Sequence, residues 1–463
     1  MHENYTIEKL FNEISDLEVK NDLFNLKIDN IYFWKLIRFN LYKELSIKLG
    51  LYETSHPGTK APKGNIIVKT IRRLTIGVFK GSLRDKKQFD TLIFPHSRKV
   101  IIDNKPIDIY THFKEDFLKN TNESYAIMDR PFAGKFLRKT TKNLYWNEPL
   151  TISTLKTFIK NKFNKNRISE SPFTFSHIAG ISLQSINALS NRNIIQVIDR
   201  YSNHYTYYNK LYRYHKPKRI YIVVAYGSEA LVSAAQDLGI EVVEIQHGTI
   251  SQYHSGYSYP HGVTVPYFPD KIELWGKYWF DSSNQPINES KVKYTGFQYL
   301  NNELSKYENI KRESNRVLFI SQGAIAKELI PIVIKYAKSN PNMNIIYRLH
   351  PSEVSVWRGI YPSLKESSEV LDNLSVETHI DMPLYKSFAL SKYVVGVYST
   401  ALIESIASDC FLIIIKLPGY ESFKNIIDRK IVPLVSNSKE LEEVILYNNI
   451  CSTIDTDYFF KKL

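Results

Sequence analysis

The stretch that decides the fold is VVEIQHG at residues 242–248, an apolar run that ends in a histidine and a glycine. A second run, IIYRLHP at residues 345–351, ends in a histidine and a proline. A third, YVVGVYST at residues 393–400, ends in a serine and a threonine. In open α/β sheets, ligands bind beyond the carboxyl ends of the strands, where loops and helix N-termini present polar groups. The three strand ends therefore predict one cleft for an anionic, hydroxylated ligand.

The order of apolar runs along the chain predicts an α/β fold made of two Rossmann-like domains that face a central cleft. A helix expected over residues 229–238 lies between two expected strands, which is the pattern of a parallel crossover. A chain of 463 residues is also too long for one ordinary core. We expect a helical, basic N-terminal segment at residues 1–88, a first domain at 89–305 and a second domain at 306–463.

Cysteine content and hydropathy indicate a cytoplasmic protein. The two cysteines, Cys410 and Cys451, cannot form a disulfide framework, and Cys410 stands beside an apolar run, where a reduced core thiol is expected. The N-terminus does not have the pattern of a signal peptide. No run reaches the eighteen or so apolar residues that a spanning helix needs.

The formal net charge of +14 calls for a partner. Basic residues are interleaved with apolar ones between Lys60 and Lys87, and a second basic stretch runs from Lys135 to Arg167. Such mixing at helical spacing fits a helix that lies on an anionic membrane surface. Nucleic acid is not expected as a partner, because the chain has no zinc-finger spacing, basic zipper or aromatic-rich RNA-binding pattern. A solvated basic face is the simpler alternative.

The strand ends of the second domain provide groups that can hold a phosphate and a sugar. Ser399 and Thr400 open an expected helix, whose free N–H groups and dipole favour negative charge, and Glu404 follows one turn later, where it can accept hydrogen bonds from ribose hydroxyls. Arg348 and His350 leave the same side of one strand and can together neutralise a phosphate. The expected nucleotide-binding residues are Gln322, Gly323, Arg348, His350, Pro351, Ser399, Thr400 and Glu404. The alternative for Ser399 and Glu404 is a helix cap and a surface glutamate.

The strand ends of the first domain provide candidates for acid–base chemistry. His247 has a side chain suited to proton transfer near neutral pH, although it can equally be a histidine bonded to a neighbouring carbonyl. Glu229 can orient His247 or serve as the base itself, and Asp129 is a third candidate. The expected residues that contact a second substrate are His96, Arg98, Gln246 and Tyr257. The segment at residues 253–261 is rich in aromatic and polar groups and is expected to form a flexible loop over the substrate.

These motifs resemble those of bacterial cell-surface polysaccharide glycosyltransferases of GT-B architecture, in particular the capsule-synthesis family that includes Kdo transferases. The resemblance spans residues 89–440 and rests on EIQHG at 244–248, PD at 269–270 before WG at 275–276, TG at 295–296, RLHP at 348–351, and ST at 399–400 with Glu404. Similar elements occur in bacterial sialyltransferases and in CDP-glycerol-type polymerases of teichoic acid synthesis.

The resemblance implies a function and a division of labour between the domains. The second domain would hold a nucleotide-activated sugar, with CMP-Kdo favoured, and the first would hold a capsule, O-antigen or lipid-linked glycan acceptor together with the base. No metal and no other cofactor is expected, because helix dipoles and basic side chains stabilise the leaving phosphate in such enzymes. A peripheral position on the inner face of the cytoplasmic membrane would place the cleft beside a lipid-linked acceptor.

Three alternatives remain open at this stage. A CDP-polyol donor would make the chain a polyol-phosphate transferase of teichoic-acid type. A carbohydrate- or nucleotide-binding protein without catalysis can have the same fold. An epimerase would convert a nucleotide sugar without any acceptor.

Overall fold

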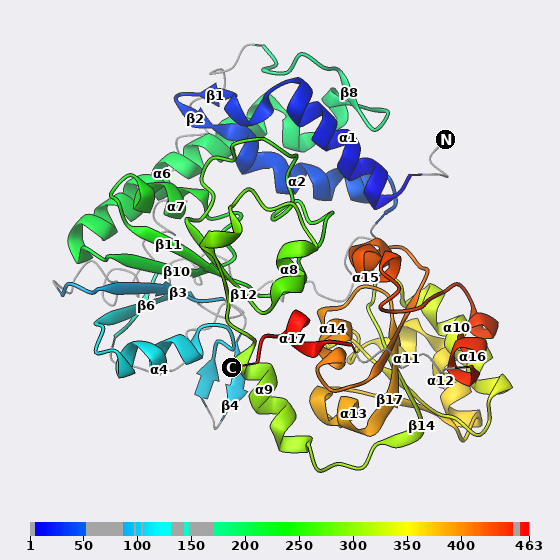
Figure 1. Cartoon of the computed structure of the whole chain (residues 1–463). Helices are drawn as coiled ribbons and strands as arrows, with labels where there is room; N and C mark the ends of the chain where they lie inside the picture. The colour runs from blue at the N-terminus through cyan, green and yellow to red at the C-terminus, as the bar shows by residue number, and fades with distance from the viewer. Residues whose placement is uncertain are drawn as a thin grey trace.

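The computed structural model describes residues 5–51, 87–96, 99–102, 105–130, 143–147, 170–447 and 454–462. These residues form two large β-sheets, each with its own helices (Figure 1). The strand order is β13-β12-β11-β10-β3-β6-β7 in the first sheet and β16-β15-β14-β17-β18-β19 in the second, and neighbouring strands are parallel in both. The expected class, two Rossmann-like α/β domains, is confirmed.

The first sheet carries helices on both faces because its strands are apolar on both sides. Its strands are β3 (Thr91–Phe94), β6 (Tyr125–Asp129), β7 (Leu144–Trp146), β10 (Arg219–Val223), β11 (Glu241–Ile245), β12 (Lys271–Leu274) and β13 (Val292–Tyr294). Helices α6 (Asn191–His215) and α7 (Glu229–Gln236) pack on one face, and α4 (His112–Asn120) packs on the other. Helix α7 and the strands on either side of it confirm the predicted crossover.

The second sheet is covered in the same way. Its strands are β14 (Glu313–Ile320), β15 (Asn344–Arg348), β16 (Leu374–Glu377), β17 (Ser391–Gly396), β18 (Phe411–Ile415) and β19 (Leu434–Val435). Helices α10 (Ala326–Ser339), α12 (Pro362–Val370) and α16 (Ser438–Leu446) cover one face, and α13 (Leu384–Leu390) and α14 (Thr400–Ile406) cover the other. Cys410, immediately before β18, is a buried free thiol, as expected.

The described part of the predicted N-terminal segment, residues 5–51, is mostly helical. Helices α1 (Ile7–Lys20) and α2 (Phe33–Lys48) are separated by a short hairpin, β1 (Lys27–Ile28) and β2 (Ile31–Tyr32). Asp29 and Asn30, between the two helices, have φ values of 50° and 62°, which belong to a turn. The two helices share one apolar core with residues of the first domain and with one face of the second sheet.

The basic stretches lie largely outside the described residues. The segment between Lys60 and Arg84 and most of the stretch from Lys135 to Arg167 belong to this part of the chain, so their contact with an anionic membrane stays a prediction. In the part that the structure describes, none of the helices combines the length and the apolar character that a membrane span requires.

The end of the chain returns to the first domain. Helix α17 (Thr456–Phe459) packs against α8 (Lys277–Asp281), and the indole N–H of Trp279 donates a hydrogen bond of 2.8 Å to the carbonyl of Phe459 (Figure 1). The backbone of α17 lies directly over Gly276, where an added Cβ would come within 2.5 Å of the Tyr458 carbonyl. The two halves are therefore joined at their chain connection, α9 (Gln298–Leu304), and again at the C-terminus.

Candidate functional site

The centre of the candidate site is the imidazole ring of His247, two residues beyond the end of β11. The ring is half-buried among aromatic side chains. His96, which follows β3, stacks on it with 5.8 Å between ring centroids, and Tyr110 meets it edge-on at 6.3 Å. The hydroxyl of Tyr257 lies 3.3 Å from Nδ1 of His247. The structure thus brings together three of the residues predicted from sequence, His96, His247 and Tyr257.

A buried carboxylate that the sequence analysis missed completes this cluster. Glu244, on β11, is 1% exposed and accepts hydrogen bonds from the hydroxyl of Tyr257 at 2.7 Å and from the backbone N–H of Ala225 at 3.0 Å. Burial raises the pKa of Glu244 to about 7, and these two hydrogen bonds oppose the rise. The signal was present in VVEI, because a carboxylate inside an otherwise apolar central strand needs a buried partner.

His247 is neutral at physiological pH. Burial, together with the smaller effects of the nearby rings of His254 and His96, lowers the pKa of its ring to about 3. His254 is itself half-buried, and its partial removal from water lowers its pKa to about 4. A neutral imidazole keeps one nitrogen lone pair, so His247 has a group that can accept a proton.

The segment at residues 253–261 is packed and does not cover the site as a flexible loop, which corrects the prediction. Tyr253, Tyr257 and Tyr259 are all buried, and the ring of Tyr226 fills the space where Gly256 has no side chain. Helix α2 holds the segment from the other side. The guanidinium of Arg38 donates to the carbonyl of Ser255, and the ammonium of Lys35 donates to the hydroxyl of Tyr259.

Arg38 is itself held by a buried carboxylate. Its Nε lies 2.5 Å from Glu18 on α1, which also accepts a hydrogen bond of 2.8 Å from the indole of Trp34. Burial alone would lower the pKa of Arg38, but Glu18 more than offsets this, and the pKa stays above its ordinary value. The N-terminal helices therefore anchor the loop that carries Tyr257.

Three further first-domain residues have roles other than those predicted. Glu229 accepts a hydrogen bond from the backbone N–H of Gly227 at 2.8 Å, and Tyr257 occupies the position beside His247 that was predicted for Glu229. Asp129, at the end of β6, forms an ion pair of 3.1 Å with Lys99. Strand β6 lies three strands away from β11, so about 14 Å of sheet separates Asp129 from the strand that precedes His247. Gln246 is fully buried and bonds to the backbone of Trp275 and Gly248. Arg98 lies outside the described residues.

The carboxyl edges of the two sheets meet at Thr249 and Thr400. Their hydroxyl oxygens are 2.9 Å apart, and an added Cβ on Gly248 would lie 3.7 Å from the same hydroxyl of Thr400. Thr400 is the first residue of α14, and the hydroxyl of Ser399 caps this helix by accepting from the N–H of Ala401 at 3.3 Å. The chain positions that follow His247 thus face the strand end of β17.

Gln322 stands next to this junction with a buried, unpaired polar atom. Its amide nitrogen lies 3.4 Å from the carbonyl of Tyr398, whereas its Oε1 is buried without a hydrogen-bond partner among the described residues. Gly323 follows it in the turn before α10. Buried acceptors are nearly always satisfied in proteins, so this atom is suited to a donor group on a ligand.

Arg348 does not reach the junction, which corrects the expectation that it would neutralise a phosphate. It is 6% exposed and forms an ion pair with Glu377 on β16, and its other nitrogen donates to the carbonyl of Met382 at 3.0 Å. His350 is exposed, and its Nδ1 lies 2.7 Å from the hydroxyl of Ser352, in the turn that Pro351 begins. Glu404 is buried and accepts a hydrogen bond of 3.0 Å from Tyr385, so it is not a surface glutamate.

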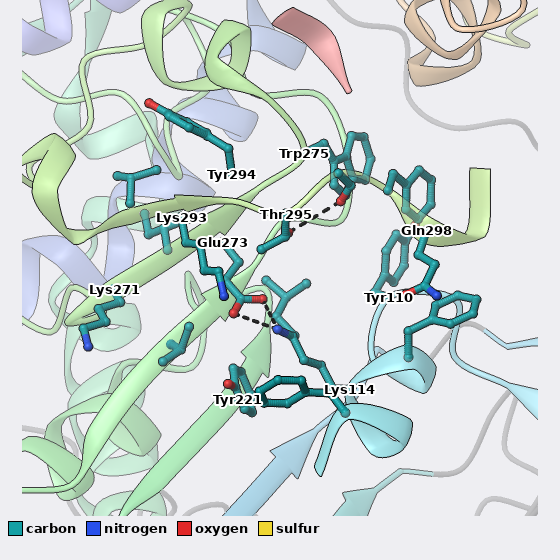
Figure 2. A pocket seen from close by; sticks show the side chains of 18 of the residues that line it. Tyr110, Lys114, Tyr221, Lys271, Glu273, Trp275, Lys293, Tyr294, Thr295 and Gln298 are labelled. Atoms are coloured by element: carbon teal, nitrogen blue, oxygen red, sulfur yellow. Dashed lines mark hydrogen bonds and ion pairs between the residues drawn. The ribbon is translucent and has the colours of Figure 1, made fainter. Parts of the chain in front are cut away.

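A cavity of about 710 Å³ opens beside the aromatic cluster, between α4 and the face of strands β10 to β13 (Figure 2). Tyr110 lines this cavity, and its ring stacks on that of Phe297. The ring of Phe297 stacks in turn on Trp275, with 4.4 Å between ring centroids. The ion pair between Lys114 and Glu273 crosses the cavity from α4 to β12. This cavity therefore combines aromatic faces with paired charges, close to His247.

Within the described ranges, no group of three or more His, Cys, Asp or Glu side chains lies close enough to hold a metal ion.

The paired parallel sheets, with their carboxyl edges in contact, are those of the GT-B class of folds. No family model matches the chain, and no curated protein matches it either. Among solved structures it is similar to UDP-GlcNAc 2-epimerase from Methanocaldococcus jannaschii in complex with UDP-GlcNAc and UDP, at 10% identity over 77% of this chain and 92% of that one, with a TM-score of 0.43.

Two other solved structures show the same degree of similarity. UDP-GlcNAc 2-epimerase from Neisseria meningitidis, bound to UDP-GlcNAc, is 12% identical over 80% of this chain and 96% of that chain, with a TM-score of 0.46. MurG from Acinetobacter baumannii is 11% identical over 78% of this chain and 91% of that chain, with a TM-score of 0.38. At these identities and scores the likeness concerns the fold alone.

Proposed function

We propose that this protein is a glycosyltransferase that moves a sugar from a nucleotide-activated donor, a CMP-sugar such as CMP-Kdo, to a capsule, O-antigen or other surface polysaccharide. The observation that carries the proposal is the contact of 2.9 Å between Thr249 and Thr400. This contact places the segment that follows His247 against the strand end that bears Ser399. The proposed proton acceptor and the proposed phosphate-binding groups would thereby come from opposite sheets to one junction.

The donor would bind on the side of the second sheet. His350 can donate to a phosphate oxygen, and the start of α14 offers backbone N–H groups and the hydroxyl of Thr400. Gln322 supports the same assignment, because its buried Oε1 can accept a hydrogen bond from the amino group of a base or from a ribose hydroxyl. Ser399, which caps α14, and Glu404, which is bonded to Tyr385, would hold these groups in place.

The acceptor would bind on the side of the first sheet, beside His96 and Tyr110. The cavity that Tyr110 lines has room for sugar units, and aromatic rings offer apolar faces to sugar rings (Figure 2). His247 would take the proton of the acceptor hydroxyl as that oxygen bonds to the anomeric carbon. The bond between the anomeric carbon and the donor phosphate would break at the same time, and its electron pair would leave with the nucleotide.

A thermal-shift screen tests the donor assignment. Purified protein would be melted with CMP, CDP, UDP, GDP and their sugar or polyol derivatives. A ligand at 100 times its Kd stabilises the folded state by about 2.7 kcal/mol, which a melting curve resolves. We expect CMP to raise the melting temperature of the wild type and not of His350→Ala. His177→Ala removes an exposed histidine of the first half and should respond like the wild type.

The outcomes separate the alternatives. A response to CDP-glycerol or CDP-ribitol would support the polyol-phosphate transferase, and a UDP-sugar converted without any acceptor would support an epimerase. Binding without turnover that is indifferent to His247→Ala would indicate a binding protein. If no nucleotide shifts the melting temperature, or if His350→Ala responds like the wild type, the assignment of the donor site is wrong.

A further inference from the structure

The carboxylate of Glu244 is separated from the ring of His247 by a single hydroxyl group. Tyr257 Oη lies 2.7 Å from Oε1 of Glu244 and 3.3 Å from Nδ1 of His247. Glu244 and Tyr257 are each 1% exposed. The three groups come from one strand end and the loop that follows it, and α2 holds that loop through Arg38 and Ser255. The arrangement is built into the fold and does not depend on exposed side chains.

A tyrosine hydroxyl has one proton, so it can donate to only one of its two neighbours. An ionised carboxylate only accepts hydrogen bonds, and it takes the proton of Tyr257 because charge-assisted hydrogen bonds are the stronger ones. The oxygen of Tyr257 then has only lone pairs to offer to His247. A hydrogen bond between the two forms when Nδ1 of His247 carries the ring proton.

We propose that Glu244 and Tyr257 are positioning residues that fix the tautomer of His247, so that Nδ1 carries the proton and Nε2 has the free lone pair. The proposal rests on the proposed function, in which His247 is the base. The proton of the acceptor hydroxyl passes to Nε2, and the electron pair of its O–H bond becomes available for the bond to the anomeric carbon. The imidazolium that forms is stabilised through Tyr257 by the negative charge of Glu244.

The same geometry makes the tautomer sensitive to the protonation of Glu244. When Glu244 takes up a proton, the hydroxyl of Tyr257 is released to donate to Nδ1, and the ring proton moves to Nε2. The pKa of Glu244, raised by burial to about 7, places this change near neutral pH. The ionisable groups around the relay are Lys35 on α2, Tyr226 after β10, Tyr257 and Tyr259 on the loop, and the rings of His96 and His254 beside His247.

The tautomer can be measured directly and without any substrate. The ring nitrogens of histidine have different ¹⁵N chemical shifts when protonated and when bare, so ¹⁵N-histidine-labelled protein reports both nitrogens of each ring. The signals of His247 are identified by their loss in His247→Gln. We expect Nδ1–H in the wild type at about pH 8.5, and a change to Nε2–H as the pH falls below about 7, where Glu244 becomes neutral.

Two variants and one control test the relay. Tyr257→Phe removes the acceptor for Nδ1–H, and Glu244→Gln replaces the carboxylate by an amide that can donate to Tyr257, so both should show Nε2–H at pH 8.5. Tyr253→Phe makes the same chemical change in the same loop, next to Glu8, and should leave the wild-type tautomer. Wild-type protein with Nε2–H at pH 8.5 would overturn the proposal even if a variant does not fold. A Tyr257→Phe variant whose His247 ring keeps its proton on Nδ1 at pH 8.5 would also overturn the proposal.

Turnover gives a second readout once the donor is known. Tyr257→Phe should lower kcat by about 100-fold or more, because a histidine in the wrong tautomer cannot act as base, and should leave KM for the donor unchanged. A merely structural role would lower stability and donor binding together. If no nucleotide binds at all, the proposed function fails while the tautomer measurement still decides the relay.

Discussion

The carboxyl edge of the first sheet is filled by its own side chains, whereas the carboxyl edge of the second sheet combines buried side chains, such as Arg348, with exposed or half-buried polar groups on short turns. Glu244, Gln246 and Tyr257 are all buried at the first edge, where the hydrogen bonds of Glu244 with Tyr257 and of Gln246 with Trp275 span 13 and 29 residues. At the second edge, His350 bonds to Ser352 and Ser399 caps its own helix, so each partner is two residues away.

The difference suggests that the two edges have different tasks. A group that transfers protons must be held in one orientation, and the first edge achieves this with interlocking hydrogen bonds that ultimately depend on the N-terminal helices. A group that binds a ligand must be accessible, and local turns leave the second edge open. The comparison predicts that substitutions near the first edge cost stability, while those at the second edge cost binding.

The largest effect is expected for Arg38→Met. This change leaves the carboxylate of Glu18 buried without its charged partner, which should lower the free energy of unfolding by about 3–5 kcal/mol. Arg358→Met removes an exposed arginine of the second half and should change the free energy of unfolding by less than about 0.5 kcal/mol. Urea unfolding of both variants measures the two values. Equal effects would mean that the first edge is held no more rigidly than the second.

An intermediate effect is expected in the pH dependence of stability. Burial raises the pKa of Glu244 from 4.5 to about 7, so between these values the folded chain binds this proton more tightly than the unfolded chain does. The contribution of Glu244 to the free energy of unfolding therefore falls by about 3 kcal/mol as the pH rises from about 4.5 to about 7. Glu244→Gln removes this contribution.

Urea unfolding of wild type and Glu244→Gln across this pH range isolates the contribution of Glu244 as the difference between two curves. His247 and His254 act in the opposite direction, because burial lowers the pKa of each, and the stability they contribute is lost as the pH falls below about 6.5. Both curves contain the contribution of His254, so it cancels, and the difference reports Glu244 together with its effect on His247. Parallel curves would show that the pKa of Glu244 is the same in the folded and unfolded chains, which would contradict this prediction.

The smallest effect is expected for His350→Ala. The side chain is exposed and bonds to a hydroxyl two residues away, so its loss should change the free energy of unfolding by less than about 0.5 kcal/mol. The measurement is the same urea titration, without nucleotide. A loss comparable to that of Arg38→Met would show that the second edge is also a built network, and the contrast between the edges would not hold.

The predictable part of the site was the part that depends on local sequence. The crossover at 219–245 followed from short-range patterns, and so did the polar strand ends at His247, His350 and Ser399. Arg348 was placed on the correct strand, but its role was not predictable, because its partner Glu377 lies 29 residues away. Glu244 was overlooked for the same reason, since its importance depends on Tyr257, which belongs to a loop with no regular pattern.

The sequence by itself determined the two-domain α/β plan, because apolar strands and amphipathic helices are selected by the spacing of neighbouring residues. It also determined which strand ends carry polar groups. Only the tertiary structure decided which of these groups face the junction between the sheets and which are used up in buried pairs. The physical reason is that a buried charge or hydroxyl must find a partner. That partner is supplied by whichever segment packs against it, as α2 does for the loop that carries Tyr257.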